Sequence, residues 1–304
     1  MLKRLFVVAV VLGLAGLAGF WVLTAPKPLA AGDLPAHTGD VAKGEQIFWT
    51  GGCGSCHAAK GAKGDDKLKL GGGQAFETPF GTFLAPNISP DETHGIGRWT
   101  ALDLVNAMKK GLSPDGRHYY PAFPYASYAR MTTEDVIDLA AYMKTLPKVA
   151  EASKPHQLGF PFNIRRGLGL WKLLFLDPAP VVALPADAPA DVLRGRYLVE
   201  GPGHCGECHS PRNPIGGIDK SRWLAGAPAL DSQGRVANLT PAPSTLGGWS
   251  AKDIAYYLEA GFTPDYDSVG GAMVSVVDNM GKISKQDRDA MAAYLKAVPP
   301  KPKG

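Results

Sequence analysis

The first long pattern along the chain is a run of 19 uncharged residues, Leu5 to Leu23, that directly follows two basic residues. Its length approaches that of a membrane-spanning helix and exceeds the apolar core of an ordinary signal peptide. A cleaved signal is the alternative, but Pro26 and Leu29 interrupt the positions at which a cleavage site would need small residues. We therefore predict a transmembrane anchor over residues 1–24, with its basic end in the cytoplasm and the remaining chain outside.

Helix-start signals recur four times beyond this segment. A Ser or Thr followed three residues later by an acid satisfies free N–H groups at the beginning of a helix. The pairs are Thr100/Asp103, Thr132/Asp135, Ser250/Asp253 and Ser284/Asp287. Behind the second and fourth pairs, apolar residues recur at helical spacing until a proline ends the pattern. Strand signals are few, so we predict an all-α fold.

These signals belong to an internal repeat with an offset of 150 to 152 residues. The offset also matches Lys43-Gly44-Glu45 with Arg194-Gly195-Arg196, and Asn87-Ile88-Ser89-Pro90 with Asn238-Leu239-Thr240-Pro241. A repeat of this length indicates a duplicated domain. We therefore predict domains at 40–148 and 191–300, a Pro/Ala-rich spacer at 25–39 and a linker at 149–190.

All four cysteines lie in two CxxCH motifs, one in each repeat: Cys53-Gly-Ser-Cys56-His57 and Cys205-Gly-Glu-Cys208-His209. CxxCH is the attachment sequence of c-type haem, in which the thiols form thioethers with the porphyrin and the histidine ligates the iron. Zinc and redox-dithiol sites also use CxxC pairs. Here, however, the motifs are 152 residues apart, and each carries a histidine in the same place. The sequence therefore predicts two covalently bound haem c groups, one at the centre of each domain.

Two further strings carry a specific resemblance. Residues 118–128, HYYPAFPYASY, and residues 160–165, FPFNIR, are similar to the multihaem cytochrome subunits of membrane-bound alcohol and gluconate dehydrogenases. The layout of each repeat resembles class I cytochromes c. Those subunits typically carry three haems on a longer chain, whereas this chain has two motifs. The resemblance implies two tandem class I cytochrome c domains, each wrapped around one haem, that carry electrons at the outer face of the inner membrane.

In the second domain, Met273 stands where this class usually supplies the sixth iron ligand, between Gly261 and the last helix. A thioether opposite the histidine closes the iron to other ligands and raises its potential, which suits electron transfer. We predict Met273 as this ligand. A gap-filling core methionine is the alternative role, and Met280 is the alternative ligand.

The first domain departs from the pattern. In the related alcohol dehydrogenase subunits the equivalent string contains a methionine, but here Phe123 occupies that place and cannot ligate iron. Met131 lies eight residues later and is our predicted ligand. It could instead be a hydrophobic staple against Val136, because it directly precedes the cap at Thr132. In that case His118 would ligate the first haem, or its sixth position would be open.

An apolar segment, Phe160 to Leu176, interrupts the linker and contains Arg165, Arg166 and Lys172. It is too short and too charged to span a membrane. We expect it to pack between the domains, or to lie against the bilayer or a partner dehydrogenase. The proline-rich run at 178–189 then acts as a stiff spacer.

The charge balance adds little, since 32 Lys and Arg against 28 Asp and Glu give no indication of nucleic-acid binding. No catalytic triad, phosphate-binding loop or dinucleotide fingerprint is present, so we predict no catalytic residues. We expect a dihaem electron carrier rather than an enzyme, anchored in the inner membrane with its haems in the periplasm. It would take electrons from a dehydrogenase or quinol-linked donor and pass them to another carrier or an oxidase. The alternative is a dihaem enzyme of the peroxidase or thiosulfate-oxidising type, with an open or unusual sixth position at the first haem.

Overall fold

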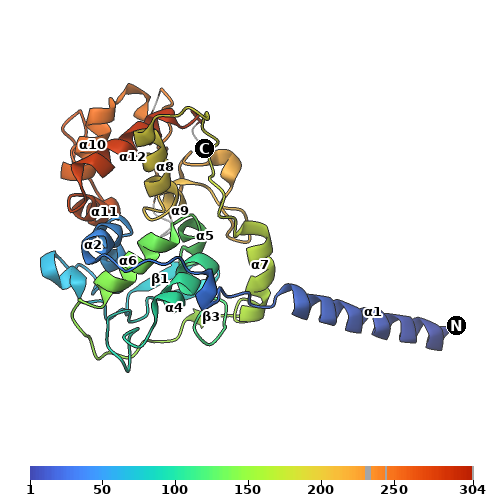
Figure 1. Ribbon diagram of the computed structural model, residues 1–304. Coiled ribbons are helices and arrows are strands. Elements are labelled where there is room, and N and C mark those ends of the chain that lie inside the picture. Colours follow the sequence, from blue (N-terminus) through green and yellow to red (C-terminus); the bar gives the residue numbers. More distant parts are fainter. Residues whose placement is uncertain (230–233, 244, 303–304) are drawn as a thin grey trace.

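The computed structural model describes residues 1–229, 234–243 and 245–302, which form a mostly helical body and one projecting helix (Figure 1). The projecting helix is α1 (Leu2–Leu23), and none of its residues is buried. Of the helices in these described ranges, only α1 is long and apolar enough to cross a membrane. Helix α1 coincides with the predicted anchor segment.

The repeat in the sequence is also a repeat of helices. The first half contains α2 (Val41–Thr50), α3 (Cys53–His57), α4 (Ala101–Val105), α5 (Tyr125–Tyr128) and α6 (Thr133–Met143). The second half contains α8 (Ala190–Glu200), α9 (Gly206–His209), α10 (Ala251–Ala260), α11 (Met273–Met280) and α12 (Lys285–Ala297). Helix α7 (Leu168–Phe175) lies between the halves in the chain, and a π-helical segment, Asn106–Lys110, continues α4. Each half thus places a short CxxCH helix directly after its first long helix.

The repeated glycines allow the long helices of each half to touch. Helix α2 packs against α6, and α8 packs against α12. A Cβ atom added at Gly44 would lie 2.0 Å from the carbonyl oxygen of Asp138, and one added at Gly195 would lie 1.9 Å from that of Ala290. A larger residue would therefore collide with the backbone of the facing helix, so both crossings require glycine.

All four predicted helix caps are confirmed. The Thr100, Thr132, Ser250 and Ser284 side chains each accept a hydrogen bond from the backbone N–H three residues ahead. At Thr100 and Ser250 the carboxylate of the acid three residues ahead also accepts a hydrogen bond from the backbone N–H of the capping residue, which completes a capping box. Local sequence therefore fixes where these helices begin.

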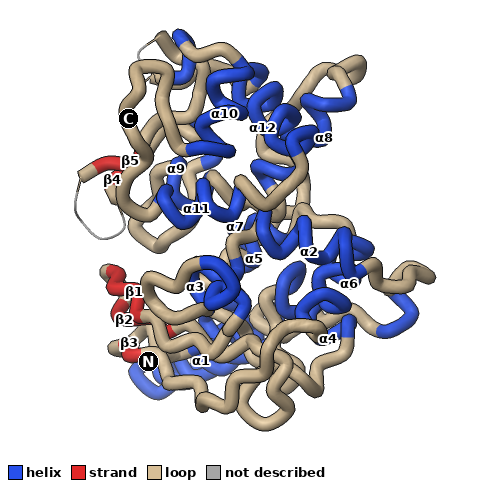
Figure 2. The backbone as a smooth tube through the Cα atoms, turned by 90° about the vertical axis from the view of Figure 1, so that its left-hand side faces the viewer, coloured by secondary structure: helices blue, strands red, loops and turns tan. Residues whose placement is uncertain are grey.

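The fold is mostly helical, as predicted, but it also contains two small antiparallel sheets that the sequence did not indicate. Strand β1 (Ala75–Thr78) pairs with β2 (Gly81–Leu84), which pairs with β3 (Gln157–Leu158); β4 (Ala227–Pro228) pairs with β5 (Arg235–Val236). Figure 2 shows these strands in red at one edge of the molecule. None of these five strands exceeds four residues, which is too short for an alternating pattern to be recognised in the sequence.

The predicted linker divides into two parts. Its beginning packs on the first half, where the Asn87 amide donates to the carbonyls of Val149 (2.6 Å) and Glu151 (2.8 Å). Helix α7 then contacts both halves: Lys172 Nζ donates to the Gly111 carbonyl at 2.7 Å, and Trp171 Nε1 donates to that of Ile215 at 3.0 Å. Helix α7 therefore touches both halves through Trp171 and Lys172, while other apolar residues of the segment remain exposed.

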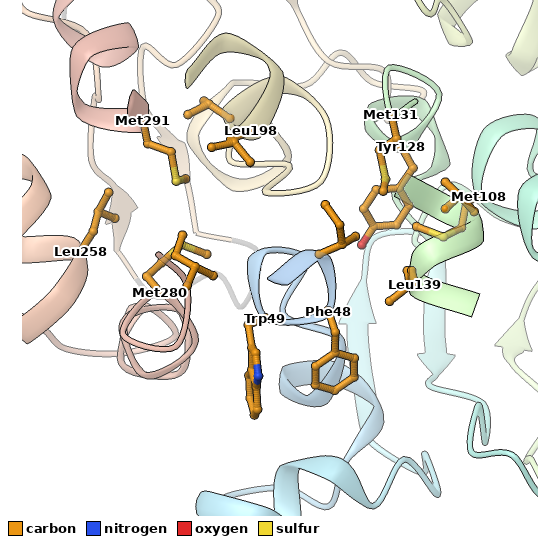
Figure 3. Packing of buried hydrophobic residues seen from close by; sticks show 14 of the residues in the cluster. Phe48, Trp49, Met108, Tyr128, Met131, Leu139, Leu198, Leu258, Met280 and Met291 are labelled. Carbon is orange, nitrogen blue, oxygen red and sulfur yellow. The ribbon is translucent and has the colours of Figure 1, made fainter. Parts of the chain in front are cut away.

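The cores of the two halves are continuous. Figure 3 shows Phe48 and Trp49 of α2 between a group that includes Met131 and a group that includes Met280. All four side chains are at most 8% exposed. Burial of this apolar surface fixes the two halves against each other, so the two CxxCH helices have a defined relative position.

Candidate functional site

The backbone before the first motif makes a tight turn that a glycine permits. Helix α2 ends at Thr50, and Gly52 then adopts a left-handed conformation with a φ of 59°. This conformation is accessible to glycine at little cost. Helix α3 begins immediately afterwards, so the turn places Cys53, Cys56 and His57 on one short helix at the end of α2.

The two motif histidines are oriented in the same way. Nδ1 of His57 lies 2.8 Å from the Pro86 carbonyl oxygen, and Nδ1 of His209 lies 2.7 Å from that of Ala237. A carbonyl acceptor requires the proton on Nδ1, which leaves the lone pair on Nε2. Within the described residues, no hydrogen bond engages either Nε2 atom. Burial lowers the pKa of both histidines, which favours the neutral, ligating form.

A repeated asparagine holds each of these carbonyl groups in place. Asn87 follows Pro86, and its side-chain oxygen accepts from the Ser89 N–H at 2.9 Å. Asn238 follows Ala237 and accepts from the Thr240 N–H at 2.8 Å. Sequence reasoning found this repeated Asn-x-Ser/Thr-Pro string but assigned it no role. In the structure it orients the histidines through the preceding carbonyl.

The four thiols are free, and their environment does not suit redox-dithiol chemistry. Burial raises the pKa of Cys53 and Cys205 to about 12. A reactive dithiol instead needs a lowered thiol pKa. Across the described parts of the chain, no group of three or more His, Cys, Asp or Glu side chains could hold a metal ion. Free thiols beside a histidine with an available Nε2 fit covalent haem, and the donor set does not fit zinc.

The two motifs face each other across the contact between the halves. His204, just before the second motif, has its Nε2 atom 3.2 Å from the Gly51 carbonyl oxygen, just before the first. The ring of Tyr128 lies edge-on to the His204 ring, with 5.5 Å between the centroids. Ser127 Oγ also donates to Glu207 Oε1, inside the second motif, at 2.6 Å. The two CxxCH segments are therefore neighbours.

The structure aligns Phe123 of the first half with Met273 of the second. The Tyr119 N–H donates to the Gly111 carbonyl at 2.8 Å, and the equivalent Val269 N–H donates to the Gly261 carbonyl at 2.7 Å. Four residues after each donor stand Phe123 and Met273, respectively. Phe123 therefore occupies in the first half the structural position that Met273 occupies in the second. Phe123 itself packs on aromatic rings, with its centroid 5.7 Å from that of Tyr128.

Met131 lies beside the first motif. It is 1% exposed and lines a small cavity together with Cys53, Tyr128 and Met108. Figure 3 shows Met131 and Tyr128 side by side. The hydrophobic-staple role also has support, because Val136 is fully buried in the same cluster.

His118 has both ring nitrogens engaged elsewhere. Its Nε2 lies 2.9 Å from the Thr24 carbonyl oxygen, and its Nδ1 lies 3.0 Å from Lys172 Nζ. This arrangement leaves no ring nitrogen for iron, so His118 is removed from the candidate sixth ligands.

The two candidate methionines of the second half lie at opposite ends of α11. Met273 is its first residue and is half-buried. Met280 is its last residue, is 3% exposed, and lies with Met291 and Leu258 in the core (Figure 3). The position of Met280 corresponds to a packing role.

Comparison with known proteins agrees with this site. The cytochrome c family model matches residues 41–147, which cover the first motif. A diheme cytochrome c-type protein of Cereibacter sphaeroides is 54% identical over 286 residues, which are 94% of this chain and 95% of the relative.

Two further relatives are longer. The fructose dehydrogenase cytochrome subunit of Gluconobacter japonicus is 36% identical over 91% of this chain and 55% of its own length. The alcohol dehydrogenase (quinone) cytochrome c subunit of Gluconacetobacter polyoxogenes is 37% identical over 90% of this chain and 60% of its own length. The chain thus spans little more than half the length of these two subunits.

Proposed function

Because the chain belongs to the dihaem members of the cytochrome c family, we propose that its two halves are tandem class I cytochrome c domains that carry electrons. The protein has two covalently bound haem c groups, which supply one-electron transfer when bound. Cys53 and Cys56 would attach the first haem and His57 would ligate it. Cys205, Cys208 and His209 would do the same for the second.

The observation that carries this proposal is the matched pair of motif histidines. Each histidine donates from Nδ1 to a carbonyl and keeps Nε2 available. The fixed tautomer and ring orientation are what an iron ligand requires from its surroundings. Because the two motifs adjoin across the contact between the halves, they would hold the two haems near each other, which would suit electron transfer between them.

Each haem iron also needs a sixth ligand or an open sixth position. Met273 would supply a thioether to the second haem, and Met131, which lines a cavity with Cys53, would supply one to the first. The Phe123 substitution is the specific observation that favours the rival function, an enzyme with an open first haem.

We place the haem domains in the periplasm, with α1 as an uncleaved anchor in the inner membrane. The support is the length and exposed apolar surface of α1, with basic residues at its start. The relatives named as dehydrogenase cytochrome subunits support a membrane-bound dehydrogenase or quinol-linked complex as the electron donor. A further carrier or an oxidase would be the acceptor.

Exposure of the reduced protein to carbon monoxide distinguishes an electron carrier from an enzyme with an open haem. A carrier with two closed haems should show unchanged spectra when the reduced protein is exposed to carbon monoxide, and both haems should be reduced and reoxidised reversibly in a potentiometric titration. Rapid carbon monoxide binding by one haem of the wild-type protein would show an open site and favour the enzyme. Recovery of the protein only as a soluble form that starts near Ala31 would contradict the anchor.

A further inference from the structure

The C-terminal end of α1 packs against the folded body. Thr24, the residue that ends α1, is fully buried although the helix before it is exposed. Its carbonyl accepts from His118 Nε2 at 2.9 Å, and its hydroxyl accepts from Arg166 Nε at 2.8 Å. At Gly169 of α7, a Cβ atom would lie 2.5 Å from the Thr24 Cα, so α7 touches this backbone directly.

Arg166 completes the end of the helix. Its Nη2 donates to the Trp21 carbonyl at 2.6 Å, and its guanidinium carbon lies 4.3 Å from the centroid of the Trp21 ring. The last carbonyls of a helix lack partners within it and gain from a nearby cation. Tryptophan is enriched where a membrane helix leaves the hydrocarbon. These contacts place Arg166, just before α7, at the level at which α1 would leave a bilayer.

Helix α7 buries a charged residue and exposes apolar residues, the opposite of an ordinary surface helix. Its buried residues are Gly169 and Lys172, and Nζ of Lys172 donates inward to the carbonyls of Lys110 and Gly111, at 2.7 Å each. Leu170, Leu173 and Leu174 are exposed. A helix on the surface of a soluble protein normally buries its apolar stripe and exposes its charges.

Leu170, Leu173 and Leu174 follow the spacing i, i+3 and i+4, so they share one face of α7. Together with three exposed apolar residues of the segment just before α7, they are named the apolar foot. Their exposed fractions are Phe160 81%, Phe162 44%, Ile164 50%, Leu170 40%, Leu173 58% and Leu174 68%. An exposed apolar helix face indicates an interaction site. Figure 1 shows α7 on the side of the body from which α1 projects, running across the direction of α1.

We propose that the apolar foot lies in the interfacial layer of the bilayer that α1 crosses, with phospholipid as its occupant. This inference rests on the proposed function only in that α1 must remain as an anchor. If α1 spans the bilayer, its contacts with Gly169 and Arg166 leave α7 no position other than the membrane surface. A short helix with exposed leucines beside basic residues suits that layer.

A second contact with the membrane would give the haem domains a fixed orientation. The anchor alone would allow the body to turn about the α1 axis and tilt. With the foot embedded, the body is held at two places, so the same face is always presented to a donor in the membrane.

The test uses the full haem-loaded protein, in which thioether bonds consume the native thiols. A single Leu173→Cys residue then carries the only nitroxide spin label, in liposomes of phosphatidylcholine and phosphatidylglycerol. Collisions with dissolved oxygen, which concentrates in lipid, are compared with collisions with a water-soluble nickel chelate. Tyr266→Cys, at a residue that is 91% exposed in the second half, is the water-exposed control.

We expect the label at 173 to favour oxygen and the label at 266 to favour nickel. Leu170→Glu with Leu174→Glu should reverse the preference at 173 while the protein still floats with the liposomes. Leu193→Glu, an exposed leucine on α8, should leave the preference unchanged.

Equal access of nickel to both labels in liposomes would overturn the proposal. Protection of the label in native membranes but not in liposomes would also overturn it, because it would identify a protein as the occupant. Failure of the wild-type protein to float with liposomes would instead reject the anchor, and with it the proposed location, so the two failures are distinguishable.

Discussion

The hydroxyl oxygens of Ser55 and Ser275 lie 2.7 Å apart, so a hydrogen bond joins the helix of the first CxxCH motif to the helix that begins at Met273. Asn279 strengthens this link, because its amide nitrogen donates to Ser55 Oγ at 2.8 Å and its amide oxygen accepts from Lys67 Nζ at 3.0 Å. The attachment helix of one haem site is therefore bonded to the helix of the other site's proposed sixth ligand. A change of structure at one site has a direct route to the other.

Loss of the Asn279 side chain should weaken the contact between the halves. Lys67 is only 5% exposed, and its other acceptors, the Ser275 carbonyl and Asp278, lie at the longer distance of 3.4 Å. Asn279→Leu leaves this buried ammonium short of an acceptor. We expect a loss of about 1–3 kcal/mol in the free energy of unfolding, measured by urea denaturation followed by circular dichroism.

Asp278→Ala provides the control for this measurement. The Asp278 side chain is 53% exposed, so its ion pair with Lys67 is screened by solvent. Its removal should cost less than about 1 kcal/mol. Equal losses for the two variants would show that the Asn279 amide has no special role in the contact.

Removal of a motif thiol should reduce the haem content of one half. Cys53→Ser or Cys205→Ser takes away one of the two thioether bonds at its site, so the corresponding haem should be attached more weakly and be partly lost after denaturation. The pyridine haemochrome assay measures this loss against two haems per chain in the wild-type protein. Ser55→Ala, between the two cysteines of the first motif, should retain both haems. Full haem content after replacement of all four cysteines would contradict covalent attachment.

Much of this architecture could be predicted because its determinants are local. Four caps depend on two residues each, and both CxxCH motifs are contiguous. Helix α1 is encoded by a single uninterrupted apolar run. The repeat also located Gly44 and Gly195, although only the structure explains them, because the close approach involves a helix almost 100 residues away.

The parts that could not be predicted depend on partners that are distant in the chain. The Thr24 carbonyl meets His118 across 94 residues, and nothing local to either residue indicates that contact. Likewise, the sequence makes His118 a candidate iron ligand, and only the structure shows Lys172 at its other ring nitrogen. The strands were missed for a different reason, since two to four residues carry too little pattern to be recognised.

The stability of the protein should depend on pH through Lys172. Burial lowers the pKa of this amine from the ordinary value of 10.5 to about 7. Between those pH values the unfolded chain holds a proton that the folded chain has lost, so stability rises with pH from about 7 to about 10.5 and is lowest below that range. Burial also lowers the pKa of His118, which lies beside Lys172, from its ordinary value of 6.5, so His118 is neutral across this pH range.

The comparison of Lys172→Met with the wild-type protein isolates this contribution. The melting temperature of the wild type should increase relative to that of the variant as the pH is raised from 7 to 10. Lys285→Met, at a lysine that is 77% exposed, should show no such trend. A difference between the wild type and Lys172→Met that stays constant with pH would show that Lys172 keeps its charge throughout.

The final prediction concerns the sixth ligand of the first haem, where Met131 has two possible roles. Met131→Leu removes the thioether but keeps the apolar volume, so the staple against Val136 would survive, whereas an iron bond would not. If Met131 is the ligand, we expect loss of the sulfur-to-iron charge-transfer absorption of one haem, a lower potential for that haem, and new binding of carbon monoxide. Met273→Leu is the matched comparison and should do the same to the other haem, so the double variant should lose both contributions. A Met131→Leu protein with wild-type spectra and potentials would assign Met131 to packing and, with His118 already engaged, would leave the first haem open.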